Sequence, residues 1–78
     1  MILEIITPEK AIFNGEVLSV TFPGISGEFE ILNQHAPIIS TLTSGKIKVI
    51  TSDNNTETFD VNGGVIEMQN NKIIVLAE

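Results

Sequence analysis

The sequence predicts an all-β domain, a small sandwich of about eight to ten short, mainly antiparallel strands. Isoleucine, valine, threonine and phenylalanine dominate the chain, and these side chains favour strands. No stretch combines an apolar stripe at helical spacing with a capping residue at its start, so no helix is expected. Turn-forming residues recur every few positions, at Pro8, Asn14-Gly15, Pro23-Gly24, Ser26-Gly27, Ser44-Gly45, Asp53–Asn55, Asn62–Gly64 and Asn70-Asn71.

The segments between these turns have the side-chain patterns of strands. Met1–Thr7 is apolar, lacks a basic region, carries Glu4 and stops at Pro8, so it is read as a strand and not as a signal peptide. The next segments show the two-residue period of strands with one buried face. Leu18, Val20 and Phe22 alternate with Ser19 and Thr21, Ile47 and Val49 with Lys46 and Lys48, and Phe59 and Val61 with Thr58 and Asp60.

Three segments break this alternation and carry apolar side chains toward both faces: Ile2–Ile6, Ala36–Ile39 and Lys72–Ala77. Such a pattern is unusual for a sheet with one solvated face, so something should cover the second face. A sandwich without helices has nothing of its own to cover it. We therefore expect an exposed apolar surface, which usually marks a site where another protein binds. The residues alone indicate an interaction module.

The length, charge and composition of the chain exclude several structures and kinds of partner. Its 78 residues form a single domain, residues 1–78. The formal charge of −6 disfavours binding to nucleic acid or to anionic lipid headgroups. No apolar run approaches the roughly 18 residues of a membrane span, so no direct lipid insertion is expected. There is no cysteine, which excludes disulfides and thiolate metal sites.

The only histidine, His35, is a candidate general base, with Glu28 or Glu30 as its carboxylate partner. A histidine-based metal site would need further nitrogen or sulfur donors, which the chain lacks. We therefore expect no catalytic residue, no cofactor and no metal here. No serine lies in the Gly-x-Ser-x-Gly setting of an activated nucleophile, neither Ser26, Ser40 nor Ser44.

Three polar or glycine-rich stretches are predicted to be turns. Asp53–Glu57 resembles a calcium loop, but it lacks the interior glycine and the distal glutamate, so a solvated hairpin is expected. Asn62–Val65 lacks the Gly-Lys-Ser/Thr of a phosphate loop and is expected to be a turn or bulge. The same prediction holds for Gly24–Gly27.

The stretch Asn33–Pro37 differs from these turns because it is rich in hydrogen-bonding groups and is stiffened by a proline. Such a loop can display side chains to a partner at low entropic cost. Asn33 and His35 can also bond the backbone of their own loop. The two roles are compatible, and the residues alone leave both open.

Five short motifs occur in order along the chain: Thr7–Gly15, Gly27–Leu32, His35–Ile39, Ser44–Ile47 and Asn62–Glu67. Taken together, they resemble the epsilon subunit of F-type ATP synthase. The resemblance covers nearly the whole chain and implies a β-sandwich of about ten strands. It implies a rotor subunit at the foot of the central stalk, which clamps the gamma subunit to the ring of c subunits and couples proton translocation to ATP synthesis.

The resemblance also implies a role for single residues. Ser26, Gly27 and Glu28 match an acidic turn that faces the polar loops of the c ring, and Glu28 would pair there with a basic or amide group. His35, Ala36 and Pro37 match a neighbouring loop, expected at the same end of the sandwich and also facing the ring. Thr7, Ile38 and Ser40 match positions that face gamma, in less distinctive surroundings.

Many members of this family continue into two helices that can inhibit ATP hydrolysis and in some cases bind ATP. The 78 residues have no counterpart of these helices, so they represent either a short form without the helical hairpin or part of a longer chain, and the sequence leaves both open. We assign neither property to these residues. The implied location is peripheral, on the cytoplasmic side of a bacterial inner membrane, with membrane association through the complex.

The composition is also compatible with a second class of protein, the small acidic β-sandwich domains that carry a lipoyl or biotinyl group on a lysine at a hairpin tip. In those domains the modified lysine commonly stands in Asp-Lys-Ala or Met-Lys-Met. None of the four lysines has such neighbours: Lys10, Lys46, Lys48 and Lys72.

Overall fold

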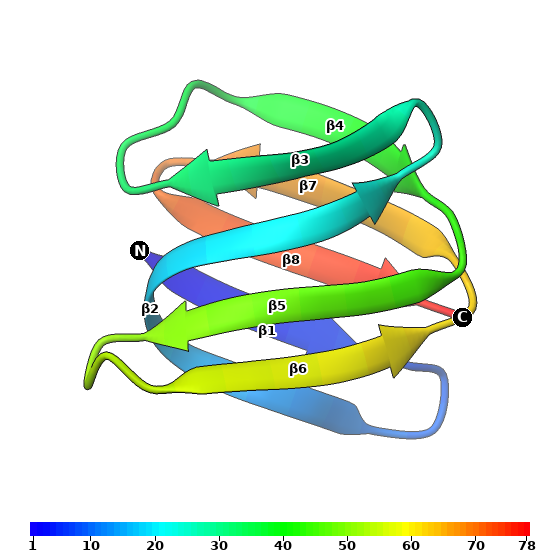
Figure 1. Ribbon diagram of the computed structural model, residues 1–78, viewed down its shortest axis with the longest axis horizontal. Coiled ribbons are helices and arrows are strands. Elements are labelled where there is room, and N and C mark those ends of the chain that lie inside the picture. The colour runs from blue at the N-terminus through cyan, green and yellow to red at the C-terminus, as the bar shows by residue number, and fades with distance from the viewer.

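The computed structural model describes residues 1–78 and contains eight strands and no helix (Figure 1). All connections between the strands are short turns or loops, as the spacing of turn residues predicts. The strands are β1 (Ile2–Ile6), β2 (Ala11–Gly24), β3 (Gly27–Leu32), β4 (Ile38–Leu42), β5 (Gly45–Thr51), β6 (Thr56–Val61), β7 (Gly64–Gln69) and β8 (Lys72–Ala77).

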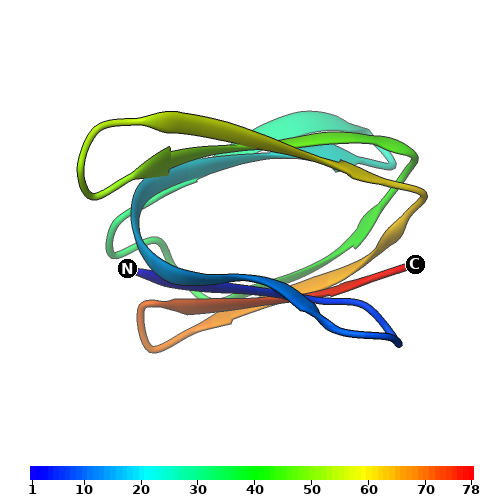
Figure 2. The ribbon, with the colours of Figure 1, turned by 90° about the horizontal axis from the view of Figure 1, so that it is seen from below.

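The strands form two layers that face each other, as the view in Figure 2 shows. The front layer of Figure 1 has the order β3-β2-β5-β6, and the back layer has the order β4-β7-β8-β1-β2. β2 belongs to both because its first half pairs with β1 and its second half with β3 and β5. This 14-residue strand therefore contributes one strand segment to each layer. The all-β sandwich predicted from the sequence is confirmed.

Pairing is antiparallel throughout, with one exception. β1 and β8 lie side by side and run parallel, with Ile2 opposite Lys72 and Ile6 opposite Leu76. The first and last strands of the chain are therefore direct neighbours in the back layer. β7 and β8 pair antiparallel beside them, from Gly64 opposite Ala77 to Gln69 opposite Lys72.

The inner faces of both layers form one apolar core. Burial alternates along the strands as predicted for Ile47, Val49 and Val61, with Phe59 packed at the margin. Phe13 of the back layer and Phe59 of the front layer meet edge to face, with their ring centroids 5.5 Å apart. The buried residues are Met1, Leu3, Ile5, Val17, Val20, Phe22, Ile31, Leu42, Ile47, Val49, Val61, Ile66, Met68, Ile73, Val75 and Ala77.

Two predictions made from local pattern were wrong, and both concern β2. Asn14-Gly15 is not a turn but lies inside the strand, where Asn14 pairs with Glu4 and Gly15 with Leu3. Leu18 does not face the core. The pairing with β5 shifts between Val17 and Ser19, so that Leu18 is an extra residue in a β-bulge and is 47% exposed.

Candidate protein-docking surfaces

The loops gather at two opposite ends of the sandwich, because successive antiparallel strands run back and forth (Figure 1). One end holds the β1–β2, β2–β3, β4–β5 and β6–β7 connections, and we call it the Ser26 end. The other holds the β3–β4, β5–β6 and β7–β8 connections, and we call it the His35 end. Each end presents a set of polar loops to solvent.

The expectation that Ser26–Glu28 and His35–Pro37 share one end is wrong. They precede and follow the same strand, β3, which has six residues. A strand rises about 3.3 Å per residue, so this strand holds the two segments roughly 20 Å apart. The sequence gives their order but not the direction in which β3 crosses the sandwich. Any partner that contacts both must span the molecule.

The β2–β3 turn at the Ser26 end is held by the neighbouring strand β4. The Ile25 backbone N–H donates to the Thr41 carbonyl oxygen at 3.2 Å, and the Thr43 N–H donates to the Pro23 carbonyl oxygen at 2.8 Å. Gly27 has a φ of 127°, as expected of a glycine that supplies a conformation rare in other residues. The side chain of Ile25 is 65% exposed at the tip. The turn is therefore a fixed, partly apolar projection.

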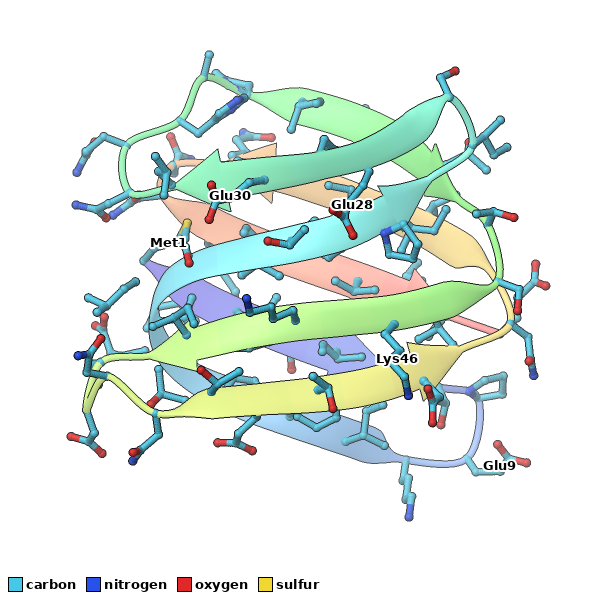
Figure 3. All side chains as sticks on the ribbon, in the orientation of Figure 1. Met1, Glu9, Glu28, Glu30 and Lys46 are labelled. Carbon is cyan, nitrogen blue, oxygen red and sulfur yellow. The ribbon has the colours of Figure 1, made fainter.

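The outer face of the front layer is charged. Figure 3 shows Glu28 and Glu30 projecting from β3 and Lys46 from β5. Glu28 lies opposite Pro23 at the Ser26 end of its strand. Lys46 is exposed and makes an ion pair with Asp60, with 2.7 Å between Nζ and Oδ1. A surface of this kind is suited to remain in water or to contact polar groups.

The outer face of the back layer carries the exposed apolar surface that the sequence predicts. Directly paired residues lie on the same face of a sheet. Val65 of β7 pairs with Leu76 of β8, while Glu67 of β7 lies between Ile39 and Ile74. A hollow of about 180 Å³ lies among these side chains. We call this surface the apolar face and define it as Ile39, Val65, Ile74 and Leu76, with Glu67 in their midst.

The three residues expected to face gamma lie in different settings. Ile38 pairs with buried Met68 and packs against the core, so it is the following residue, Ile39, that projects outward. Ser40 also faces inward and, with Ser26, lines a hollow between β4 and the β2–β3 turn. Thr7 lies in the β1–β2 connection, where its hydroxyl donates to the Lys10 carbonyl oxygen at 3.0 Å.

The β3–β4 loop, Asn33–Pro37, is exposed along its whole length. The His35 ring lies near its own backbone, with Nδ1 2.7 Å from the Ala36 carbonyl oxygen. The His35 backbone N–H donates to the Leu32 carbonyl oxygen at 3.2 Å. Of the two roles left open for this loop, His35 therefore bonds the backbone of its own loop, whereas Asn33 bonds Asn71 of the β7–β8 turn at 2.9 Å.

The structure brings together no catalytic constellation around His35. Neither Glu28 nor Glu30 forms a hydrogen bond with its ring. No cluster of three or more acidic, histidine or cysteine side chains is placed to hold a metal ion. Asp53–Asn55 lie in the β5–β6 hairpin loop, as predicted, and Thr56 and Glu57 begin β6. In this loop the Asn55 N–H donates to the Thr51 hydroxyl at 3.2 Å. The structure contains no helix capable of crossing a lipid bilayer.

Sequence reasoning missed the outward position of Ile39, Val65 and Leu76 as single residues, although it predicted an apolar outer surface. A signal for Val65 was present, because Val65, Glu67 and Gln69 alternate with buried Ile66 and Met68. Sequence reasoning also missed the contact between the β3–β4 loop and Asn71, since no local pattern joins positions so far apart in the chain.

Comparison with known proteins relates the whole chain to one family. The family model described as the ATP synthase delta/epsilon chain β-sandwich domain matches residues 1–78. The ATP synthase epsilon chain of Chlorobaculum tepidum is 45% identical over 76 residues, which are 97% of this chain and 86% of the relative. That of Sulfurimonas denitrificans is 46% identical over 76 residues, and the match covers 97% of this chain but 58% of the relative.

Two solved structures have the same fold. A chain in the cryo-EM structure of the Euglena gracilis mitochondrial ATP synthase superposes with a TM-score of 0.92 at 19% identity. The match covers 99% of this chain and 49% of that one. A chain in the Tetrahymena thermophila central stalk and c-ring structure gives a TM-score of 0.82 at 20% identity, covering 99% of this chain and 62% of that one.

Proposed function

Because the chain belongs to the family of ATP synthase delta/epsilon chain β-sandwich domains, we propose that it is a non-catalytic rotor component of an F-type ATP synthase. In this proposal the domain clamps the gamma subunit to the ring of c subunits and so couples proton translocation to ATP synthesis. The observation that carries the proposal is the contrast between the two outer faces of the sandwich. One is apolar and unpartnered, and the other is charged.

The apolar face is the surface we assign to gamma. Ile39 and Leu76 are exposed, and together with Val65 and Ile74 they surround a single acidic side chain, Glu67. Burying such side chains against another protein supplies free energy of association, roughly 25 cal/mol per Å² of apolar surface. The fully buried centre of a stable interface has this composition, with few charged groups.

The β3–β4 loop is continuous with the apolar face. Pro37, Ile39 and Glu67 line one further shallow hollow on the outer side of β4 and β7. The fold also separates His35, Ala36 and Pro37 from the Ser26 end. For both reasons we assign these three residues to the margin of the surface that faces gamma. Thr7 follows Ile6, which pairs with Leu76, and it lies at the opposite margin of the same surface.

The Ser26 end is the part we assign to the polar loops of the c ring. It offers Ile25 and Ser26 at the tip of a turn fixed by β4, and Glu28 just behind them on the charged face. The β4–β5 and β6–β7 turns lie beside this tip and line a common hollow with Ile25. Glu28 would set the register of docking by pairing with a basic or amide group of the ring.

The proposed mechanism is mechanical. When proton flow turns the ring, gamma must turn with it, and a domain bound to both prevents slip between them. In this mechanism the apolar area buried against gamma supplies the binding free energy, and polar contacts at the Ser26 end fix the orientation of the domain on the ring. The domain would lie at the cytoplasmic side of a bacterial inner membrane and reach the membrane only through its partners.

The test is to mix the chain with the gamma subunit from the same source and to follow size-exclusion chromatography with light scattering. We expect a stoichiometric complex. The matched control is the double variant Ile39→Ser and Leu76→Ser, which should stay folded and elute apart from gamma. Separate peaks for the unaltered chain, or a complex that survives the double substitution, would contradict the assignment of the apolar face.

A further inference from the structure

The β3–β4 loop is held from outside by one residue of the β7–β8 turn. The Asn71 Oδ1 atom accepts the Gln34 backbone N–H at 2.8 Å. Its Nδ2 atom donates to the Asn33 Oδ1 atom at 2.9 Å. The backbone of Asn71 is itself tied to β1, because the Ile2 N–H donates to the Asn71 carbonyl oxygen at 3.2 Å. One side chain thus joins the loop to the body of the sandwich.

Apart from this contact, the first residues of the loop are held only by the turn that the His35 N–H closes with the Leu32 carbonyl oxygen. All of Asn33–Pro37 is exposed, so no buried side chain holds it. Gln34 has a φ of 65°, a left-handed conformation that is unfavourable for a residue with a side chain. The bond that the Gln34 N–H donates to Asn71 stabilises that conformation directly. Without it, only the bond from the His35 N–H to the Leu32 carbonyl oxygen opposes a return of Gln34 to the commoner backbone regions.

We propose that Asn71 is a positioning residue that holds the β3–β4 loop in the form in which His35, Ala36 and Pro37 meet a partner protein. The inference rests on the proposed function only for the identity of that partner, the gamma subunit. Asn71 acts by keeping the binding-competent loop populated, since a partner's apparent affinity falls in proportion to the fraction of competent molecules.

The chain offers a matched pair of substitutions for the test, Asn71→Gly and Asn70→Gly. Both residues lie in the same turn with left-handed φ values, 59° for Asn71 and 53° for Asn70, which glycine adopts readily. Both changes therefore keep the turn and raise the entropy of the unfolded chain alike. Only the first removes the contact with the loop. A third variant, Asn71→Asp, keeps an oxygen that can accept from Gln34.

Two quantities are measured on the 78-residue chain: the amide hydrogen-exchange rate of Gln34 and the dissociation constant for purified gamma. We expect Asn71→Gly to accelerate exchange at Gln34 by about tenfold and to weaken gamma binding about fivefold, because the two exposed hydrogen bonds of the Asn71 side chain are lost. Asn70→Gly should change neither. Asn71→Asp should restore most of the exchange protection. The thermal midpoint of Asn71→Gly should lie below that of Asn70→Gly, because only Asn71→Gly loses hydrogen bonds of the folded state.

Each contrary result has a distinct meaning. Unchanged exchange at Gln34 in Asn71→Gly overturns the inference, because the loop then holds its shape without Asn71. Lost protection with unchanged gamma affinity overturns the link between loop shape and docking. If the unaltered chain does not bind gamma, the proposed function fails, while the exchange comparison still decides whether Asn71 positions the loop.

Discussion

Ile39 is the most exposed large apolar side chain of the molecule, at 77%. Its neighbour Ile38 packs against the core, and the difference between them is a matter of register alone, because Ile38 pairs with Met68 and Ile39 with Glu67. The sequence shows that these two isoleucines must face opposite sides of a strand. Which one faces outward depends on the partner strand β7, so it could not be predicted from the local pattern.

Replacing Ile39 by serine should weaken binding to gamma by roughly tenfold, because a large apolar side chain then no longer enters the interface. The free energy of unfolding should change by less than about 0.5 kcal/mol, as is usual for exposed positions. Isothermal titration calorimetry with gamma and thermal unfolding of the free chain measure the two effects.

Leu18→Ser is the control for this substitution, since Leu18 is also exposed and apolar but lies in the bulge of β2, outside the apolar face. It should leave the affinity for gamma unchanged. Equal losses from both substitutions would mean that the apolar face is not a defined docking surface.

Glu28→Lys should weaken docking on the c ring by about tenfold or more, because reversing a charge at the margin of an interface places like charges together. Binding to gamma should persist, since Glu28 projects from the other layer of the sandwich. Retention of each variant on an immobilised, detergent-solubilised c ring is the measurement.

The control is Glu57→Lys, the same charge change at an exposed position near the opposite end of the sandwich. It should leave ring binding intact. If Glu57→Lys reduces retention as much as Glu28→Lys does, net charge and not the Ser26 end governs docking.

The strands themselves were largely predictable, and the exceptions lie where two strands impose a geometry on a third. Alternation predicted the buried residues of β5 and β6, because each of those strands has one wet face. β2 was misread at Asn14-Gly15 and at Leu18. Pairing with β1 keeps Asn14-Gly15 extended, and the register shift in the pairing with β5 turns Leu18 away from the core. Both causes lie in strands remote along the chain, and a local pattern does not contain them.

Gly64→Ala should destabilise the domain by roughly 3 kcal/mol, because Gly64 has a φ of 146° and its missing side chain leaves room for the backbone of β8. A Cβ atom there would collide with the Leu76 carbonyl oxygen, a backbone atom that can move only with its strand. Urea unfolding followed by circular dichroism gives the difference in free energy.

Gly15→Ala serves as the comparison. A Cβ atom at Gly15 would meet only the ring of Phe13, at an ordinary contact distance of 3.5 Å. This variant should be as stable as the unaltered chain or slightly more stable. Comparable destabilisation by the two alanines would show that the close approach of β7 and β8 at Gly64 is not the cause.

At the scale of the whole molecule, fold class and the existence of an apolar outer surface followed from composition and period, while the topology did not. The pairing of β1 with β8 joins segments from the two ends of the sequence, and nothing in Ile2–Ile6 identifies its neighbour. The two candidate loops were recognised by their motifs, yet their separation to opposite ends depends on how β3 crosses the sheet. A motif identifies a loop without giving its direction in space.

The parallel pairing of β1 and β8 determines how the domain resists stretching. Ile2 lies at the His35 end and Ala77 at the Ser26 end, so a force that pulls these two residues apart shears the ladder along its length (Figure 1). Five paired positions, from Ile2 opposite Lys72 to Ile6 opposite Leu76, then bear the load together. Pulling between Asn62 and Glu78, at one end, would instead peel β7 from β8 one pair at a time.

Single-molecule pulling through these two pairs of attachment points should therefore give a higher rupture force for Ile2 with Ala77 than for Asn62 with Glu78, at the same loading rate. Equal forces would show that the β1–β8 ladder is not the element that yields. If the domain transmits force between two partners, as we propose, the component of that force along the strands is borne by this ladder.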